Sequence, residues 1–452
     1  MLAVRLALAI PYVVAIALLL ADAFGWLRDV APRSPARRCW PWIAAIVVTY
    51  ALQLVIVRYG ATHAVPYEPW RAGMPLPTVF LYSVNSDWIE IALLACGALQ
   101  SYAMLVLYRS KPATVAVVLA MAALIVMSLI EPALTSADLY SNVGYALLGA
   151  QSYAPPVTPF SGEFSTISNW WGTPLVPAPY GPLWLAIDRA VTAFPATLLG
   201  KMMALRIFCC ACFVALPLLI RELGLPRRLI VATALNPVLA MQFVVDAHND
   251  VLALAIVLCA AIAFRRRAIA IGAILLVVTG LLKLPYVVLA LPVLAVLPSR
   301  RDRLAVAGAA VVATLAASWW LGGAQYVVSM MTHVTQQGPV RPDFVWHTVA
   351  LAVGFVLIAA ALLGLRRLRT AVWLLPSIGG FFPTFVYPWY LLWGLPYALA
   401  RHRVTAYLLI WLPFVAALVD QLAIQLWTIL FVFPAILFLS LRLDRHRPTA
   451  SE

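Results

Sequence analysis

The sequence predicts an all-α polytopic membrane protein of about 12–15 transmembrane helices, because apolar stretches long enough to cross a bilayer recur along the whole chain. Of its 452 residues, 64% are hydrophobic and only 11% are charged, whereas soluble domains are about half apolar and about a quarter charged. The mean hydropathy is +0.95. Basic residues form short clusters between the apolar stretches, a pattern typical of the cytoplasmic loops of membrane proteins.

The expected membrane segments follow from these stretches, with the basic clusters as cytoplasmic markers. They fall near residues 4–24, 40–58, 88–108, 113–131, 200–220, 228–245, 250–264, 268–282, 285–298, 304–321, 347–364, 371–387, 389–400, 404–419 and 422–441. Short segments such as 389–400 are expected to be broken or tilted helices. The first segment ends in Ala-Asp-Ala, as a signal peptide can, but the arginines that closely follow it favour a retained helix.

The net charge of +14 does not indicate a nucleic-acid partner, because of where the charges lie. The basic residues occur as short loop clusters, for example Arg227-Arg228 and Arg265-Arg266-Arg267. Arginine far outnumbers lysine and alanine is abundant, which suggests a GC-rich bacterial genome and hence a bacterial plasma membrane. The six cysteines form no CxxC pair and lie mostly in apolar segments, so neither a disulfide framework nor a zinc site is indicated.

The chain is expected to form a single integral membrane domain over residues 1–452. Its parts are N-terminal helices (1–131), an extracytoplasmic loop that would be catalytic (132–199), the remaining helices (200–441) and a basic cytoplasmic tail (442–452). The cytoplasmic connections are short and contain neither a GxxxxGK[ST] nor a GxGxxG sequence. Chemistry is therefore expected on the face towards the periplasm or cell exterior, without ATP, a sugar nucleotide or another cofactor.

The loop 132–199 combines polar, aromatic and proline residues. Residues 138–150 lack proline and predict a short helix, with Ser136 as a possible N-cap. Beyond the prolines that follow, the chain returns through PAPYGPLW (177–184). One interpretation is an ordinary amphipathic segment at the interface; the other is a platform that holds Asp138 as a general base. The candidate substrate-binding residues of this region are Glu131, Tyr140, Tyr145 and Tyr180.

A second pattern is ALNPVLAMQFVVDAHND (234–250), which predicts a helix that begins or kinks at Asn236-Pro237. It ends in the polar residues Asp246, His248, Asn249 and Asp250. They could be simple helix caps. Alternatively, a histidine beside carboxylates can bind a phosphate, orient an acid or ligate a metal. On that reading His248 is a candidate catalytic residue, and Asn249 and Asp250 are candidate substrate-binding residues.

Lys283, in GLLKLPYVVLALPVL (280–294), is one of few lysines and lies at the outer end of two apolar segments. It could extend to the headgroups, or its ammonium could attract a lipid phosphate. The aromatic segment FFPTFVYPWYLLWGLP (381–396) is either an interface belt or the wall of a groove, with Trp389 and Tyr390 as substrate-binding candidates. Four residues expected in the last outer loop could supply further phosphate contacts, namely His333, Arg341, Asp343 and His347.

In order along the chain, DLY with YALLGAQSYAPP, PYGPLW, NP with HND, the KLP of residues 283–285, and PWYLLW resemble the bacterial polyprenol-phosphate-mannose-dependent α-mannosyltransferases. These multi-span enzymes belong to the glycosyltransferase C superfamily. The resemblance runs from about residue 130 to 400 and implies a glycosyltransferase C-like bundle with its active site in extracytoplasmic loops. It also implies a polyprenyl-phosphate-linked sugar donor; mannose follows from the resemblance alone, and arabinose or glucose donors remain open.

An early outer-loop aspartate is the catalytic base in that superfamily, and by motif match the role falls to Asp138. The family often has paired acids there, whereas this sequence has Ala137-Asp138, and four expected spans precede the loop rather than one. The alternative base is Glu68 or Asp87 in the outer stretch 59–87, but the residues around Asp87 do not match.

The implied reaction is an inverting displacement at the anomeric carbon, in which an acceptor hydroxyl attacks and polyprenyl phosphate leaves. The acceptor would be a glycolipid or polysaccharide, and the membrane lipids surround the site. The donor phosphate would be bound by Lys283, Arg341 and His347, with His248 as a further group near it. A divalent metal is compatible with this chemistry, but no cluster of carboxylates indicates one.

Two other functions fit the sequence. A lipid or solute transporter or flippase would use Asp246, His248 and Asp250 as coupling groups. Transporters tend to contain internal repeats and polar groups in the middle of spans, whereas here the two halves show no repeat and the polar residues cluster at span ends. A non-catalytic scaffold is the third interpretation, and it predicts that Asp138→Asn leaves function intact.

Overall fold

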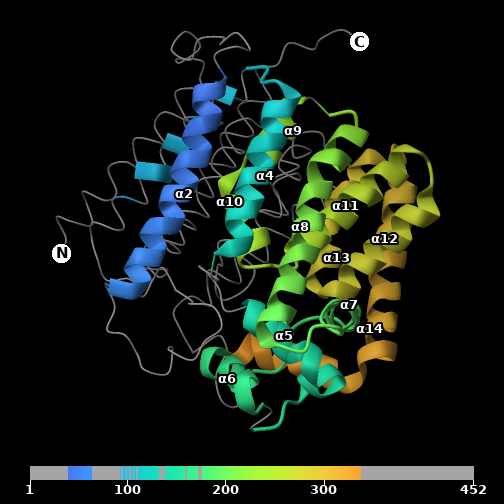
Figure 1. Cartoon of the computed structure of the whole chain (residues 1–452). Coiled ribbons are helices and arrows are strands. Elements are labelled where there is room, and N and C mark those ends of the chain that lie inside the picture. The colour runs from blue at the N-terminus through green and yellow to red at the C-terminus, as the bar shows by residue number, and fades with distance from the viewer. Residues whose placement is uncertain are drawn as a thin grey trace, which may run out of the picture.

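The computed structural model describes residues 39–63, 110–131, 138–157, 160–171, 176–225 and 227–336, with scattered helical positions between 92 and 107. Every regular element in these residues is a helix (Figure 1). The first part contains α2 (Trp40–His63), α4 (Thr114–Ile130), α5 (Asp138–Leu148), η4 (Gly149–Tyr153), η5 (Gly162–Phe164), α6 (Ser165–Trp171) and α7 (Pro182–Val191). The second contains α8 (Leu198–Glu222), α9 (Arg227–Ala234), α10 (Pro237–Ala240), η6 (Met241–Val245), α11 (Asp250–Arg265), α12 (Ile269–Leu282), α13 (Pro285–Ala290), η7 (Leu291–Val296) and α14 (Arg300–Gln336).

Two described helices are long and apolar enough to cross a membrane, namely Leu198–Glu222 and the part Arg300–Met330 of α14. A third candidate is the pair Arg227–Ala234 and Pro237–Val245, whose two parts are bent by 50°. Shorter apolar helices lie at Trp40–Ile56, Thr114–Ile130 and Ile269–Leu282. An all-helical membrane protein is therefore supported by the described part of the chain.

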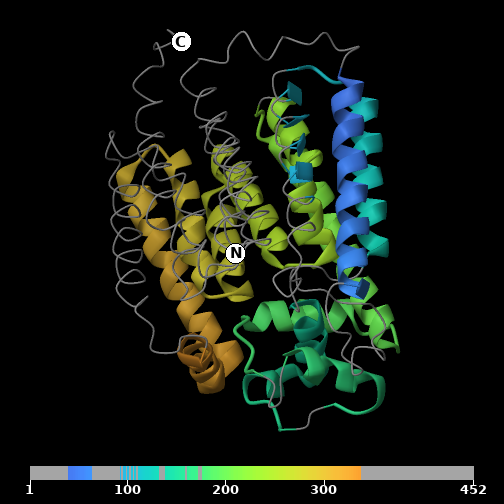
Figure 2. The ribbon, with the colours of Figure 1, turned by 90° about the vertical axis from the view of Figure 1, so that its left-hand side faces the viewer.

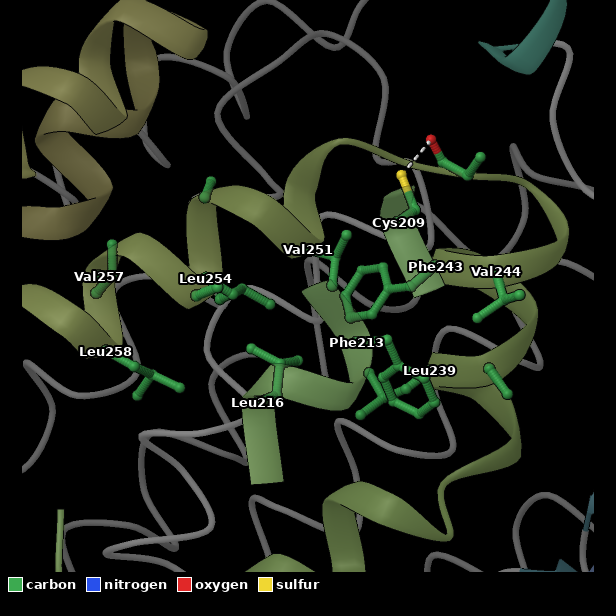
Figure 3. Packing of buried hydrophobic residues seen from close by; sticks show 14 of the residues in the cluster. Cys209, Phe213, Leu216, Leu239, Phe243, Val244, Val251, Leu254, Val257 and Leu258 are labelled. Atoms are coloured by element: carbon green, nitrogen blue, oxygen red, sulfur yellow. Dashed lines mark hydrogen bonds between the residues drawn. The ribbon is translucent and has the colours of Figure 1, made fainter. Parts of the chain in front are cut away.

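The core of the bundle forms where α8 packs against the η6 and α11 region (Figure 3). One side of α8 contributes Cys209, Phe213 and Leu216, spaced three or four residues apart as one helix face requires. The Phe213 ring meets the Phe243 ring at a centroid distance of 6.4 Å and an interplanar angle of 60°. Small residues in α11 allow close approach of its neighbours, as is common between membrane helices.

The predicted kink at Asn236-Pro237 is confirmed. The Asn236 side chain accepts hydrogen bonds from the backbone N–H of Val238 (3.0 Å) and Leu239 (3.3 Å), so that it caps the second half of the pair. Pro237, which has no N–H to donate, occupies the first turn. The helix then widens into the π-helical η6 before the chain leaves it at Asp246.

The basic loops gather at one end of the bundle. Arg227 donates to the Pro112 carbonyl (2.6 Å) and to Thr114 Oγ1 (2.8 Å), which joins the start of α9 to the start of α4. Arg265 and Arg266, at the end of α11, bond to the Leu223 carbonyl and the Glu222 carboxylate at the end of α8.

Helices α5, α6 and α7 form a layer across the other end of the bundle (Figures 1 and 2). The predicted helix in 138–150 is confirmed as α5, which continues into η4, while Ser136 lies outside the described residues. The Glu163 carboxylate accepts from the backbone N–H of Leu198 at 3.2 Å, which ties this layer to the N-terminus of α8. Helix α14 breaks at Gly323, whose φ of 62° favours glycine, and its last part also crosses this end (Figure 1).

Candidate active site

An extended segment of residues 176–181, here called the strap, brings four parts of the chain together. It is bound through its backbone. Two of its N–H groups donate to carbonyls: Ala178 N–H to Ser152 (2.9 Å) and Gly181 N–H to Leu282 (2.7 Å). Three of its carbonyls accept from side-chain hydroxyls: Val176 from Tyr145 (2.8 Å), Ala178 from Ser329 (2.6 Å) and Tyr180 from Tyr153 (3.3 Å). These partners come from α5, η4, the end of α12 and the last part of α14. The strap therefore has one fixed position, and with it Tyr180.

Asp138 is the first residue of α5 and contacts the strap residue Tyr180. Its Oδ2 atom is 3.3 Å from Nδ1 of His248 and accepts a hydrogen bond from the Tyr180 hydroxyl at 3.4 Å. The carboxylate also sits in the first turn of its helix, where negative charge is favoured. The Asp138 side chain is 15% exposed and that of His248 is 1% exposed, so the carboxylate is the accessible member of the pair.

His248 reaches Asp138 because the backbone turns sharply after η6. Ala247 has a φ of 52°, a left-handed conformation that non-glycine residues rarely adopt and that is typical of functional sites. The His248 N–H donates to the Gln242 carbonyl at 3.2 Å. Burial alone would lower the pKa of His248, but the hydrogen bond and charge of Asp138, with the charges of Asp246 and Asp250, raise it above its ordinary value.

Asn249 and Asp250 begin α11, yet the Asn249 side chain makes no capping hydrogen bond. Instead the Tyr286 hydroxyl donates to Asp250 Oδ1 at 2.7 Å and to Asn249 Oδ1 at 3.3 Å. Both side chains are buried. The polar end of this segment is thus directed towards α13, and a simple cap does not account for Asn249.

Lys283 lies between α12 and α13 in an extended conformation. Its ammonium is 5.4 Å from the centroid of the Tyr180 ring and 5.8 Å from that of Tyr286, within the range of cation–π interactions. Burial lowers the pKa of Lys283, and the charges of Asp250 and Asp138 act in the opposite direction without cancelling the effect. The Lys283 side chain therefore belongs to the same cluster as the carboxylates of Asp250 and Asp138.

Six of the residues selected from the sequence meet in one place: Asp138, Tyr180, His248, Asn249, Asp250 and Lys283. Three others lie in the adjoining interior. Tyr140 is fully buried, and Tyr145 packs edge-on against Tyr180 at 6.0 Å. Glu131 ends α4 and is 7% exposed. The candidates Arg341, His347, Trp389 and Tyr390 lie outside the described residues, as do Asp343, Glu68 and Asp87.

Sequence reasoning did not select Tyr286 or Arg206. Tyr286 follows Lys283 by three residues, so the same motif carried a signal for it. Arg206 is the single charge in the middle of the apolar helix α8, and an ionisable residue inside a span is a functional candidate by default.

The cluster offers a carboxylate oriented by a histidine and a tyrosine, with a cation beside it. Such an arrangement can accept a proton from a hydroxyl and stabilise negative charge on a leaving group. Among the described residues, no group of three or more His, Cys, Asp and Glu side chains could hold a metal ion.

A family model described as "Alpha-(1->6)-mannopyranosyltransferase, N-terminal domain" (the MptA_B family) matches residues 42–300. The matched range is more than half of the chain and contains Asp138, Tyr180, His248 and Lys283. No curated protein and no solved structure matches the chain.

Proposed function

The chain belongs to the alpha-(1->6)-mannopyranosyltransferase family, and from this premise we propose that it transfers mannose from a polyprenyl-phosphate donor to a glycolipid or polysaccharide acceptor. Family membership supports mannosyl transfer, and the family description indicates an α-(1→6) linkage for the product. The donor class, the acceptor class and the extracytoplasmic location of the reaction are parts of the proposal. So is a glycosyltransferase C-like arrangement of the whole bundle.

The observation that carries the proposal is the meeting of Asp138, His248, Tyr180 and Lys283. They come from four separate motifs, yet His248 Nδ1 is 3.3 Å from the Asp138 carboxylate and Lys283 Nζ lies 5.4 Å from the Tyr180 ring. A scaffold would have no reason to gather a base, an orienting histidine and a cation. In a transporter such groups would be expected nearer the middle of the spans.

In the proposed reaction, the acceptor hydroxyl attacks the anomeric carbon of mannose and its proton passes to the Asp138 carboxylate. A bond forms between the acceptor oxygen and this carbon while the bond from the carbon to the phosphate oxygen breaks, and the configuration inverts. Base catalysis of this kind typically contributes about 10²–10⁴-fold in rate. His248 and Tyr180 hold the carboxylate in position, because each bonds to its Oδ2 atom.

The leaving group is a polyprenyl phosphate, so positive charge must stand on the other side of the anomeric carbon. Lys283 is the described residue that offers it, since it is close to Asp138 and half-buried at the end of an apolar helix. No strong general acid is needed because the phosphate leaves as an anion. Arg341 and His347 remain proposed as additional phosphate contacts.

The location of the cluster fits a donor whose chain is dissolved in the membrane. Helix α8 has 25 residues and is therefore about 37 Å long, close to the thickness of a bilayer with its interfaces. The turn that carries His248 contacts the N-terminal half of α8, at Cys209, and the arginines bond at the C-terminal end of the helix. If the arginines are cytoplasmic, as the positive-inside rule predicts, the cluster faces the other side.

The test is a transfer assay with the full-length protein in nanodiscs, polyprenyl-phosphate mannose as donor and a membrane glycolipid fraction as acceptor, read by mass spectrometry. Asp138→Asn is expected to fold and to lose at least about 100-fold in rate. Asp302→Asn, in the first turn of α14 at the arginine end, is the matched control and is expected to retain the rate. Absence of transfer by the wild-type protein from mannose, glucose and arabinose donors would refute the proposal. Equal rates for Asp138→Asn and wild type would remove Asp138 from the role of base.

A further inference from the structure

Arg206 is a fully buried charge outside the cluster described above. It lies in α8, a helix long and apolar enough to span the membrane, and its relative exposure is 0%. An ionised group in such a place is strongly destabilising unless hydrogen bonds and opposite charges surround it. The proposed reaction does not use Arg206 directly, so its presence there requires another explanation.

The guanidinium of Arg206 terminates α4. Its Nη1 atom donates to the Leu129 carbonyl at 3.4 Å and to the Glu131 carbonyl. The last carbonyls of a helix have no partner inside the helix and carry the negative end of its dipole, so a cation there is stabilising. Glu131 is already extended, with φ −88° and ψ 153°, which means that the chain leaves α4 at the point where Arg206 binds it. Asp138 follows seven residues later.

The same guanidinium interacts with two buried acidic residues. The charges of Asp246 and Glu131 both act on Arg206, and their side chains are 0% and 7% exposed. Asp246 also acts on His248, two residues along the chain. The charge of Asp246 therefore acts on both Arg206 and His248, and His248 is influenced by the carboxylates of Asp246 and Asp138.

Helix α8 contacts the turn that carries His248 at a second point. Cys209, three residues after Arg206 and hence on the same face of the helix, donates from its thiol to the Ala247 carbonyl at 3.5 Å (Figure 3). Ala247 is the residue with the left-handed φ of 52°. A strained backbone persists only where its surroundings hold it, and the face of α8 with Arg206 and Cys209 is one of those surroundings.

From these contacts we propose that Arg206 is a positioning residue of the active site. It fixes the end of α4 and holds Asp246, and thereby sets both the place of His248 and the charge that His248 faces. This inference rests on the proposed function, because it assigns Arg206 a role in the same transfer reaction. It differs from a purely structural role, since the loss of Arg206 would leave Asp246 to compete with Asp138 for His248.

The kinetic test compares Arg206→Gln and Arg206→Lys with wild type. Misplacement of a catalytic pair from a distance can lower the rate by about 100-fold, and this loss is expected in kcat of Arg206→Gln, with KM changed by no more than about threefold. Arg206→Lys should recover part of the rate, because it restores the charge but not the planar fork of donors. Arg221→Gln, at the exposed end of the same helix, is the control and should keep the wild-type rate.

The pH–rate profile separates positioning from simple stabilisation. The charged groups that face His248 are Asp138 from α5 and Asp246 and Asp250 from its own segment, with Lys283 beside Asp138 and Asp250. The step in the profile that belongs to His248 is the one that disappears in His248→Asn. Without Arg206 the surroundings of His248 become more negative, so this step should move to higher pH by about one unit in Arg206→Gln and stay in place in Arg206→Lys. An unchanged kcat and an unchanged step in folded Arg206→Gln would overturn the inference.

Labelling of Cys209 tests the same inference without the transfer reaction. In a protein whose other five cysteines are replaced by alanine, Cys209 is buried and bonded to Ala247, so a maleimide should modify it slowly. If Arg206 holds this turn, Arg206→Gln should raise the labelling rate by about tenfold, since local opening becomes easier; an unchanged rate would count against the inference even if no donor were turned over.

Should Arg206→Gln fail to fold, the double variant with Asp246→Asn removes both charges and leaves no uncompensated one. Wild-type kcat in that double variant would overturn the proposal.

Discussion

Replacement of Gly181 by alanine tests whether the strap must lie directly against the end of α12. A Cβ atom at this position would be 2.1 Å from the Leu281 carbonyl oxygen and 2.7 Å from the carbonyl carbon of the same residue. Both are backbone atoms and cannot rotate away, so the strap itself must move. In moving, it loses the hydrogen bond from Gly181 N–H to the Leu282 carbonyl, now 2.7 Å long.

The expected loss follows from these two effects. Overpacking of a close contact typically destabilises by about 1–3 kcal/mol, and loss of a backbone hydrogen bond adds about 1 kcal/mol. The free energy of unfolding of Gly181→Ala should therefore fall by about 2–4 kcal/mol. Because Tyr180 precedes Gly181 and bonds to Asp138, a shift of the strap should also lower the transfer rate by about 100-fold.

Thermal unfolding in detergent and the nanodisc transfer assay measure the two effects separately. The control is Gly308→Ala in α14, where a Cβ would meet nothing within 4 Å. In a helix this exchange should stabilise by up to about 1 kcal/mol, and the transfer rate should not change. A Gly181→Ala protein as stable and as active as wild type would show that the contact between the strap and α12 is not required, and the reasoning about the site would fail with it.

Two further variants concern the groups around Lys283. Burial lowers the pKa of Lys283 below its ordinary value of 10.5, so the transfer rate should decline as the pH rises through that lowered pKa. Lys283→Arg should have a smaller rate without this decline, because the guanidinium stays protonated. A wild-type pH–rate profile that is flat up to pH 10.5 would contradict the assignment. Tyr286→Phe removes the hydroxyl that donates to Asp250 and Asn249; the free energy of unfolding should fall by about 1–3 kcal/mol and KM for the donor should rise, and unchanged values of both in calorimetry and kinetics would show that Tyr286 does not hold this segment.

Several of the described helices could be predicted closely from the sequence, but α14 extends to Gln336, beyond the expected end at residue 321, so that His333 lies in a helix and not in the expected outer loop. Expected segments 200–220, 250–264 and 268–282 correspond to α8, α11 and α12, whose ends lie within two residues of the expected ones. The reason is physical: the apolar length and the flanking arginines define where a helix can leave the membrane. The break at Asn236-Pro237 was predictable for a similar reason, because proline cannot donate to the preceding turn.

The site was predictable only as a set of separate candidates. Asp138 alone suited a helix N-terminus, Asn249 alone suited a cap, and Lys283 alone suited extension to the headgroups. What distinguishes them is their mutual distance, such as the 3.3 Å between Asp138 and His248, residues 110 positions apart in the sequence. No local pattern contains that distance.

The contacts that hold the strap could not be predicted at all. Ser329 donates to the Ala178 carbonyl across 151 residues, and any residue type at 178 would present the same carbonyl. A backbone acceptor cannot be recognised from the residue type, so in the sequence Ser329 looks like any other small residue of an apolar helix. Arg206 is intermediate, because its isolation among apolar residues is visible but its partners Glu131 and Asp246 are not.

The need to satisfy backbone hydrogen-bonding groups explains why so polar and aromatic a loop follows an apolar helix. An extended segment next to hydrocarbon must have its N–H and C=O groups satisfied, since water is scarce there. Tyrosine suits this task because it brings a large apolar ring together with a donor, and the hydroxyls of Tyr145 and Tyr153 are used in this way on the strap. The hydroxyls of Tyr180 and Tyr286 instead reach carboxylates, those of Asp138 and Asp250. These four tyrosines therefore divide by hydroxyl partner into two that support the backbone and two that bond to carboxylates. The second pair, whose rings also flank Lys283, is the pair that lies at the proposed donor site.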